Sequence, residues 1–319
     1  MLIFDIYPCL SVILMRSILK TDGRSYHMEL RVLQYFLTVA REQSLTGAAE
    51  FLHLSQPTLS RQLKDLEQEL GKQLFNRGNR GVTLTEEGMI LRKRAEEIFE
   101  LVKKTESEIS LSDDNIAGDV YIGAGESYLN RIIARTAYEL KKTYPDIHYH
   151  IASGNAVFVM EQLDKGLIDF GLLYGAVDRT KYHSIKVPLS DIFGVLMRKD
   201  SELAGKEFIT AQDLLDKPLI VSHQETREGW PILSTLTRDV SELNVVATYT
   251  LLFNGSLLVE EGLGYAICFD KLINTTGDSN LCFRPLRPAV ETSPSIVWKK
   301  YQVLTKAAEK FLKCLQKAF

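Results

Sequence analysis

The sequence of 319 residues has few cysteines and no metal-binding pattern among them. Its four cysteines form no Cys-x-x-Cys pair, and none stands at metal-ligand spacing from one of the six histidines. Small disulfide-rich scaffolds and zinc-stapled domains are therefore excluded. We expect reduced, partly buried thiols in a cytoplasmic protein that holds no metal and no cofactor.

The sequence also lacks an excess of basic residues. It has 38 lysines and arginines against 41 acidic residues, a formal net charge of −3. A nucleic-acid function therefore cannot rest on bulk charge and depends on where the charges lie. With 45% hydrophobic and 25% charged residues, the composition is that of a soluble globular protein, and the length predicts two or three domains.

No hydrophobic run is long enough to suggest a transmembrane helix. The apolar stretch near the N-terminus is broken by Asp5 and Pro8 and is shorter than the ~20 residues that a spanning helix needs. Its basic residues follow the apolar part, the reverse of a secretory signal, and a membrane anchor is the weaker alternative. We expect residues 1–27 to be a non-native or disordered extension, with Met28 opening the protein.

Enzyme motifs are missing as well. There is no G-x-S-x-G, no P-loop and no H-E-x-x-H. The segment GAGES, residues 123–127, lacks the third glycine and the acidic ribose partner of a dinucleotide site. Glu260 and Glu261 are adjacent on a predicted helix and point to different sides, so they cannot act as a paired acid and base. We predict no catalytic residues, with a transferase on a two-lobed fold as the alternative.

What the sequence does contain, from Met28 onward, is a pattern of three short helices. Apolar residues recur at helical spacing over residues 30–42. Ser44 can cap a second helix, and Ser55 can cap a third that ends at Gly71. Three helices with a tight turn before the third are typical of a helix-turn-helix, whose third helix enters the DNA major groove.

The predicted third helix has an apolar stripe and a polar face without acids. Leu59, Leu63, Leu66 and Leu70 form the stripe, and no Asp or Glu occurs between Phe51 and Lys64. A polar face alone is more often a solvated surface. The following segment, LFNRGNRGVTLT at residues 74–85, predicts a hairpin with a basic tip that is also free of acids. Two such elements in an acidic chain favour contacts with DNA phosphates and base edges.

A long helix with one narrow apolar seam follows, and Thr85 can cap it. Packing within one chain is an alternative, but a heptad seam with charges elsewhere favours pairing with a second copy. A two-fold dimer would present two recognition helices to a pseudo-palindromic site. The predicted dimerisation residues are Leu91, Ala95, Ile98, Val102 and Ile109.

Residues 29–88 resemble the N-terminal domain of LysR-type transcriptional regulators. The run SQPTLSR and the wing pattern L-F-x-R…G-V-x-L-T-x-x-G carry this resemblance. It implies a winged helix-turn-helix, a linker-helix dimer interface and an effector domain of the periplasmic-binding-protein type. It also implies DNA contacts at Gln56, Pro57, Thr58, Ser60, Arg61, Lys64, Arg77 and Arg80.

Beyond a polar hinge at residues 110–119, predicted strands alternate with helices, which indicates a parallel sheet with crossover helices. The predicted fold class is therefore α/β, with a helix-rich winged helix-turn-helix before a two-lobed Rossmann-like domain of the type 2 periplasmic-binding-protein kind. The predicted domains are residues 28–86 for DNA binding, 87–117 for the linker and dimerisation helix, and 118–319 for effector binding. Lobe I is expected at 118–190 and 270–319, and lobe II at 191–269.

A ligand in such a fold should lie at the carboxyl ends of strands and near helix N-termini. Each residue there is more often a turn or cap residue than a ligand contact, and the resemblance favours the loops near 127, 154 and 222. The negative charge of the Glu126 carboxylate would disfavour binding of a simple anionic effector. A neutral, amine-bearing or hydroxylated effector is compatible with it. The candidate effector residues are Gly125, Glu126, Ser127, Ser153, Asn155, Ser222, His223 and Asn254.

The sequence thus predicts a DNA-binding transcriptional regulator that binds promoter DNA as a homodimer or homotetramer and responds to a small-molecule effector. No membrane partner is expected. A metabolite-binding protein without a DNA function is the rival hypothesis.

Overall fold

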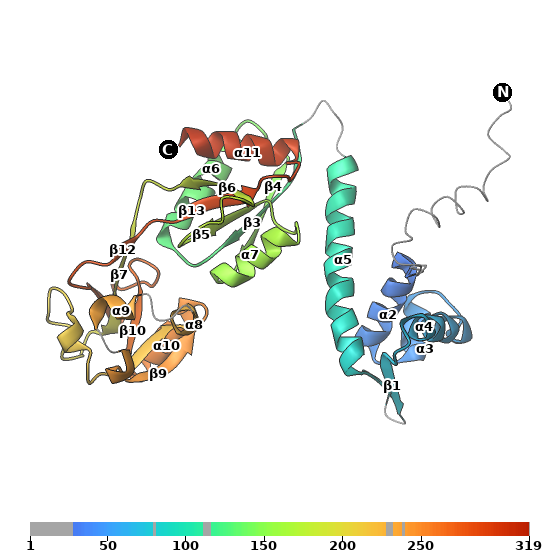
Figure 1. Cartoon of the computed structure of the whole chain (residues 1–319), viewed down its shortest axis with the longest axis horizontal. Coiled ribbons are helices and arrows are strands. Elements are labelled where there is room, and N and C mark those ends of the chain that lie inside the picture. Colours follow the sequence, from blue (N-terminus) through green and yellow to red (C-terminus); the bar gives the residue numbers. More distant parts are fainter. Residues whose placement is uncertain (1–27, 79–80, 111–115, 228–231, 238–239, 319) are drawn as a thin grey trace. The chain divides into compact units, whose positions relative to one another are not determined.

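The computed structural model describes residues 28–78, 81–110, 116–227, 232–237 and 240–318 (Figure 1). The predicted extension at residues 1–27 lies outside the described residues, as do residues 111–115 of the predicted hinge. Contacts divide the chain into two compact units, Met1–Lys103 and Lys104–Phe319. This division falls inside a long helix, N-terminal to the predicted hinge.

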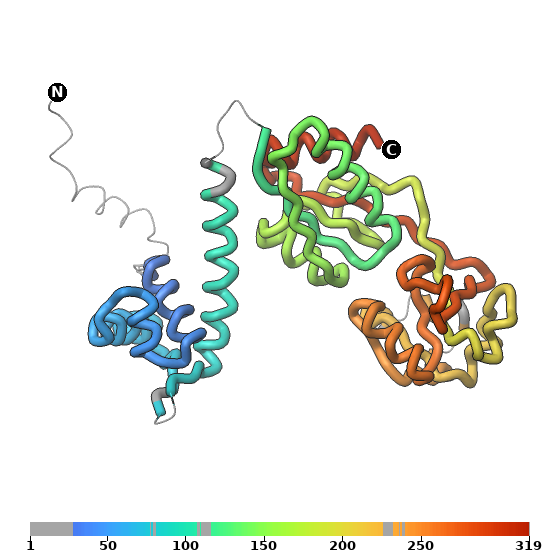
Figure 2. The backbone as a smooth tube through the Cα atoms, turned by 180° about the vertical axis from the view of Figure 1, so that it is seen from behind, coloured from blue at the N-terminus to red at the C-terminus, as the bar shows by residue number. Residues whose placement is uncertain are grey.

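Three short helices open the first unit, as predicted (Figures 1 and 2): α2 (Leu30–Glu42), α3 (Leu45–Phe51) and α4 (Gln56–Leu70). Local side chains fix where they begin. Ser44 Oγ accepts a hydrogen bond from Gly47 N at 3.1 Å, and Ser55 Oγ accepts one from Thr58 N at 3.4 Å. Gly71 ends α4 in the left-handed conformation, with φ of 63°, that favours glycine. The predicted caps and the predicted stop are confirmed.

The wing is a two-stranded antiparallel hairpin, β1 (Phe75–Gly78) and β2 (Gly81–Leu84). Gly81 has φ of 128°, and a Cβ at this position would stand 3.0 Å from the backbone oxygen of Gln43. Val82 N donates a hydrogen bond to the same oxygen at 3.0 Å. The close approach at Gly81 therefore lets the wing attach to the end of α2.

The helices and the wing share one apolar core. Three residues of the predicted stripe of α4, Leu59, Leu63 and Leu66, are buried in it, whereas Leu70 in the last turn is exposed. Phe36 of α2 and Phe75 of the wing contact each other with ring centroids 5.1 Å apart. Burying a side chain of this size contributes about 1.5–3 kcal/mol. The stripe is thus the inner face of α4, which leaves its polar face outward.

The long helix α5 (Glu86–Ser110) follows the wing, and Figure 2 traces it as one uninterrupted helix. Thr85 Oγ1 accepts a hydrogen bond from Gly88 N at 3.0 Å, which confirms the predicted cap. Glu86 and Glu87 lie in the first turn, where negative charge is favoured by the helix dipole.

The predicted seam of α5 is only partly exposed. Ala95 is fully buried within the single chain, and Leu91 packs against the core of the first unit. The expectation that Ala95 contacts a second copy is therefore wrong, because this half of α5 already packs on its own chain. The large apolar side chains exposed on α5 are Met89, Ile90, Leu101 and Ile109.

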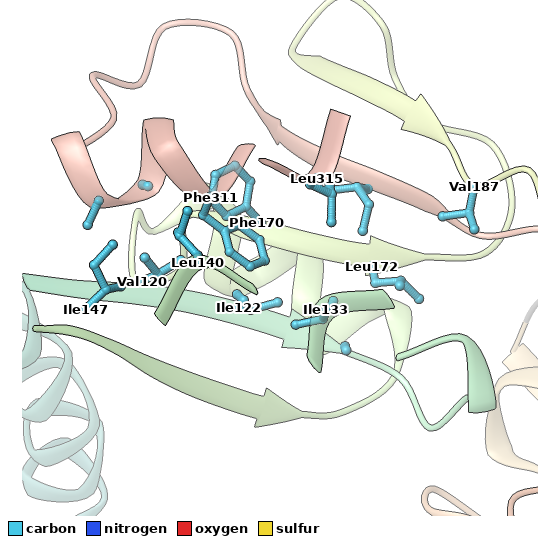
Figure 3. Close-up of a cluster of buried hydrophobic side chains, with 14 residues drawn as sticks. Val120, Ile122, Ile133, Leu140, Ile147, Phe170, Leu172, Val187, Phe311 and Leu315 are labelled. Atoms are coloured by element: carbon cyan, nitrogen blue, oxygen red, sulfur yellow. The ribbon is translucent and has the colours of Figure 1, made fainter. Parts of the chain in front are cut away.

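The second unit contains two lobes, each built on one sheet. In the first lobe the strand order is β4-β3-β5-β13-β6, and the first three of these strands are parallel. The strands are β3 (Gly118–Ala124), β4 (Ile147–Ser153), β5 (Phe170–Leu173), β6 (Tyr182–Lys186) and β13 (Ser295–Lys299). Helices α6 (Arg131–Lys141) and α11 (Lys306–Lys317) lie on one face and α7 (Ala156–Asp164) on the other (Figure 1). Phe311 of α11 packs on Phe170 of β5 with ring centroids 5.5 Å apart (Figure 3).

In the second lobe the strand order is β11-β7-β10-β8-β9, and β12 also pairs with β7. Strand β8 is parallel to β9 and β10, whereas β7 is antiparallel to β10. The strands are β7 (Asp191–Arg198), β8 (Leu219–Ser222), β9 (Val245–Tyr249), β10 (Tyr265–Phe269), β11 (Leu281–Pro285) and β12 (Glu291–Thr292). The helices are α8 (His223–Arg227), α9 (Leu233–Leu236) and α10 (Leu252–Glu260). The predicted fold class is confirmed.

The chain returns to the first lobe later than expected. The predicted return near Asp270 is wrong, because β11 and β12 still pair with β7 of the second lobe, with Leu281 opposite Arg198 and Thr292 opposite Asp191. These short strands satisfy the backbone groups on the second edge of β7. The return therefore falls between β12 and β13.

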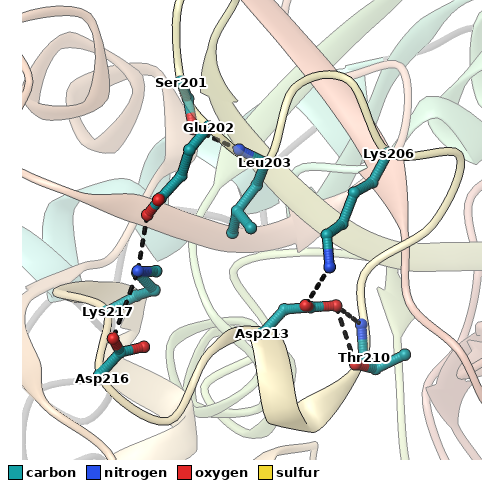
Figure 4. Close-up of polar contacts among 8 residues, drawn as sticks. All are labelled: Ser201, Glu202, Leu203, Lys206, Thr210, Asp213, Asp216 and Lys217. Atoms are coloured by element: carbon teal, nitrogen blue, oxygen red, sulfur yellow. Dashed lines mark hydrogen bonds and ion pairs between the residues drawn. The ribbon is translucent and has the colours of Figure 1, made fainter.

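Polar side chains hold the loop after β7 at the edge of the second lobe (Figure 4). Asp213 accepts hydrogen bonds from Thr210 N at 2.9 Å and from Thr210 Oγ1 at 2.8 Å. The hydrogen bond from Lys206, together with those from Thr210, holds the pKa of Asp213 below its usual value. Lys217 pairs with Glu202 at 2.6 Å. Exposed pairs of this kind contribute about 0–1 kcal/mol each, so they shape the loop more than they stabilise the fold.

Within the described ranges, no helix combines the length and the apolar character needed to cross a bilayer.

Candidate nucleic-acid interface and ligand cavity

The first half of α4 presents its polar face to solvent. Arg61 and Lys64 lie one turn apart, and neither forms an ion pair with any described residue. Their charges can therefore contact phosphates or base edges. Of the predicted DNA contacts on this helix, Ser60 is partly buried and the others are exposed: Gln56, Pro57, Thr58, Arg61 and Lys64.

Glu67, an acid near this face, is bound by the backbone of the wing. Glu67 Oε1 accepts hydrogen bonds from Leu74 N at 2.8 Å and from Phe75 N at 3.2 Å, which anchors the entry to the wing on α4. Of the predicted wing contacts, Arg77 belongs to β1. Its side chain and the whole of Arg80 lie outside the described residues, so DNA contact by the wing arginines stays a prediction.

A cavity of about 270 Å³ lies between the two lobes of the second unit. The strand ends of both sheets and the start of α10 surround it, as expected for a two-lobed α/β fold. Lobe I contributes Gly125, Glu126, Gly154, Asn155, Tyr174 and Gly175, among others. Lobe II contributes Phe193, Ser222, Gln224, Glu225, Tyr249, Leu252, Cys268 and Phe269, among others.

The cavity brings together half of the predicted effector residues. Those that line it are Gly125, Glu126, Asn155 and Ser222. Those that do not are Ser127, Ser153, His223 and Asn254. Ser153 and Asn254 are exposed, because the side chains of neighbouring residues alternate direction along the strand and around the helix. Asn155 also caps α7, since its Oδ1 accepts a hydrogen bond from Phe158 N at 2.9 Å.

Ser127 serves the crossing between the lobes rather than the cavity wall. Its hydroxyl donates a hydrogen bond to Asp191 Oδ2 at 2.5 Å, and the Tyr174 hydroxyl donates to the same carboxylate oxygen. Asp191 is buried and is the first residue of β7. Burial, and then the bond to Asp191, raises the pKa of Tyr174, so its phenol stays neutral. These three side chains fix the point where the chain enters the second lobe.

Glu126 reaches from lobe I to lobe II. Its carboxylate accepts a hydrogen bond from Leu252 N, the first amide of α10. Leu251 occupies the N-cap position of that helix and supplies no side-chain hydrogen bond. The helix N-terminus favours negative charge, so Glu126 acts as the cap that the local sequence lacks.

Sequence reasoning missed a buried acid and three aromatic side chains of the cavity. Glu225 is buried, and its carboxylate accepts hydrogen bonds from Ile232 N at 3.0 Å and from Leu233 N at 3.2 Å. The ring centroid of Phe269 lies 4.9 Å from that of Tyr174 and 4.3 Å from that of Phe193. Phe193 and Phe269 belong to β7 and β10, and Tyr174 directly follows β5. Their apolar character alone predicts only a core.

A buried ion pair in the second unit was also missed. Lys104 Nζ donates to Asp169 Oδ1 at 2.7 Å and to the Gly166 backbone oxygen at 3.1 Å. Asp169 Oδ2 accepts a hydrogen bond from Tyr121 N at 2.8 Å. Both charged side chains are less than a tenth exposed, so each compensates the other's loss of hydration.

Of the three described thiols, Cys268 and Cys282 are buried and Cys314 is partly buried. Burial raises the pKa of Cys268, which lines the cavity, and that of Cys282. A thiolate, rather than a thiol, reacts with oxidants and electrophiles. Across the described residues, no group of three or more His, Cys, Asp or Glu side chains could hold a metal ion.

A winged helix with an exposed basic face and a two-lobed domain around a ligand-sized cavity define a DNA-binding regulator with an effector domain. Family models agree: residues 30–89 match the bacterial regulatory helix-turn-helix protein, lysR family, and residues 113–319 match the LysR substrate binding domain. The chain belongs to the LysR family of transcriptional regulators.

Individual relatives support this assignment over nearly the whole chain. The HTH-type transcriptional regulator BsdA of Bacillus subtilis is 30% identical over 298 residues, which are 89% of this chain and 99% of the relative. An uncharacterised HTH-type transcriptional regulator of Shigella flexneri, YfeR, is 28% identical over 88% of this chain and 91% of its own length. The crystal structure of full-length CbnR complexed with its target DNA shares the fold, with a TM-score of 0.71, 18% identity and coverage of 92% of this chain and 100% of that chain.

Proposed function

We propose that this LysR-type regulator reads its DNA site with the exposed face of α4, in particular Arg61 and Lys64, and with the wing arginines Arg77 and Arg80. The observation that carries this proposal is the face of α4 itself. Its basic side chains are exposed and make no ion pair with a described residue, while the neighbouring Glu67 is engaged by the wing backbone. Arginine and lysine at these positions would supply base-edge and phosphate contacts.

We further propose that the chain acts as a dimer or larger homo-oligomer through α5. Exposed apolar side chains at Ile90, Leu101 and Ile109 lie on one side of this helix, together with Ile98. Pairing through this face would place two recognition helices on one DNA site with two-fold symmetry.

The cavity is proposed to bind a small-molecule effector. Because both lobes contribute to its wall, an occupant would change the relative stability of lobe arrangements, and hence the arrangement of the DNA-binding units in an oligomer. The proposal assigns no catalytic residue, since the described thiol on the cavity wall is held protonated by burial. A cytoplasmic location follows from the proposed access to chromosomal DNA.

Selection of duplexes from a random-sequence pool by the full-length chain tests this function. At about 150 mM salt, where non-specific phosphate contacts are weakened, we expect enrichment of an inverted repeat whose half-sites are about ten base pairs, or a multiple, apart. A pool that stays random after repeated rounds would favour the rival hypothesis of a metabolite-binding protein without a DNA function.

A further inference from the structure

Two acids are among the described residues that line the cavity. The described lining residues include the acids Glu126 and Glu225 and no Lys, Arg or His. The two tyrosines of the wall are neutral phenols, because burial raises the pKa of both Tyr174 and Tyr249. Among these described residues a small anion would meet no opposite charge, whereas the Glu126 carboxylate would compensate a cation.

Glu126 is the acid that a ligand can reach. Glu225 is buried, and two backbone amides bind its carboxylate. Glu126 is only partly buried, and Leu252 N is the donor to one of its two carboxylate oxygens, Oε2. The remaining lone pairs of this carboxylate can accept hydrogen bonds from an ammonium group in the cavity.

Aromatic rings form a second feature of the same cavity that fits a cation. Tyr174, Phe193 and Phe269 line it, and each is partly exposed. Phe269 stands between the other two, with ring centroids 4.9 Å and 4.3 Å away. The face of an aromatic ring attracts an organic cation and also packs against an apolar body. A carboxylate and an aromatic cluster therefore converge on one space from different strands.

We propose that the cavity binds a small organic cation, a primary amine on an apolar or aromatic body, with the ammonium group at Glu126 and the body against the rings of Tyr174, Phe193 and Phe269. The inference rests on the proposed effector function and names the class of ligand for that site. The volume of about 270 Å³ is at the small end for ligand pockets, which limits the body to roughly one ring or a short alkyl chain.

A matched pair of probes separates charge from shape. Binding of 2-phenylethylamine and of 3-phenylpropanoate to the full-length chain is measured by calorimetry, with hexylamine as an amine that lacks a ring. We expect both amines to bind and the carboxylate not to bind. In Glu126→Gln, which keeps an oxygen to accept from Leu252 N, the Kd of the amines should rise at least about tenfold, the effect of ~1.4 kcal/mol. Glu261→Gln, which removes an exposed charge near the end of α10, should leave the Kd unchanged.

Several results would overturn the inference. Binding of the carboxylate in place of the amines would reverse the ligand class and leave the effector function standing. Amine binding that survives Glu126→Gln would remove Glu126 as the anchor. If no probe binds at about 5 mM, far above the Kd expected for a fitted cavity, the organic-cation proposal fails. DNA binding by the same samples reports separately on the proposed regulator function.

Discussion

Single side chains on and around α4 differ in what they bind. Glu67 is held by the amides of Leu74 and Phe75, so its charge belongs to the fold. Arg61 is exposed and makes no ion pair with a described residue. A basic side chain that makes no ion pair in the free protein breaks no such pair when it binds a DNA phosphate or a guanine edge.

Replacing Arg61 by Ala should therefore weaken binding to the selected duplex by about 1–3 kcal/mol, which is roughly 5- to 150-fold in Kd. Fluorescence anisotropy with labelled duplex measures this change, and circular dichroism checks that the fold is intact. Arg135→Ala, an exposed arginine of α6 in the second unit, is the matched control and should bind as the wild type does. Equal affinities for the two variants would remove Arg61 from the DNA interface.

The pair formed by Lys104 and Asp169 is a buried electrostatic contact of the second unit. Lys104→Met keeps most of the side-chain volume but leaves the Asp169 carboxylate without its cation. Removing one partner of a buried pair costs about 3–5 kcal/mol, so chemical denaturation should show a loss of that order. Lys103→Met changes the exposed neighbour and should alter the free energy of unfolding by no more than about 0.5 kcal/mol. A similar small effect at Lys104 would show that the pair contributes little.

At the scale of helices and strands, most of the fold follows from local pattern. Ser44, Ser55 and Thr85 act as the caps that the sequence predicts, because a cap hydrogen bond joins residues only three apart. The predicted strands of both lobes are confirmed, and β5 and β8 among them are buried apolar runs. Strands β11 and β12 were not predicted, because they are short. They pair with an edge of β7, and no local sequence pattern indicates that this edge is open for pairing.

Helix α5 shows the limit of a heptad pattern. The spacing predicts a seam but does not say whether the seam packs on the same chain or on a second copy. Ala95 is fully buried in the single chain, whereas Leu101 and Ile109 are exposed. Ala95 therefore lies at the margin of the face proposed for pairing, and Leu101 lies within that face.

An acid at this face should weaken self-association. Leu101→Asp is expected to raise the Kd of the dimer by about 30-fold, the effect of ~2 kcal/mol at an interface hot spot. Sedimentation across a range of concentrations measures the mass. Lys103→Asp places the same acid about 200° round the helix from Leu101, at an exposed position, and should leave the mass unchanged. An unaltered mass for Leu101→Asp would show that α5 pairs through another face or not at all.

At the scale of the whole molecule, the cavity depends on contacts that no local pattern contains. Glu126 and Leu252 are 126 residues apart in sequence, yet the carboxylate of one binds the amide of the other. Sequence reasoning placed Glu126 and Ser222 at strand ends and so reached the right loops. It missed Tyr174, Phe193 and Phe269, because only the packing of two sheets brings their rings together.

A ligand-responsive regulator requires that ligand binding in the cavity changes the affinity of the DNA-binding unit for DNA. A ligand that binds one lobe arrangement tenfold more tightly than another shifts the equilibrium between them by about 1.4 kcal/mol. By the same linkage, the selected duplex should change the affinity for the ligand by the same factor.

The most direct test of the regulator function is the ratio of two dissociation constants for the full-length chain. One is for the duplex recovered by selection, and the other is for a duplex of the same composition in scrambled order, both at about 150 mM salt. Sequence-specific recognition by α4 and the wing predicts binding to the recovered duplex at least about 10³-fold tighter. A ratio near one would contradict sequence-specific recognition. Binding would then rest only on charge attraction between the basic side chains of the DNA-binding unit and the DNA.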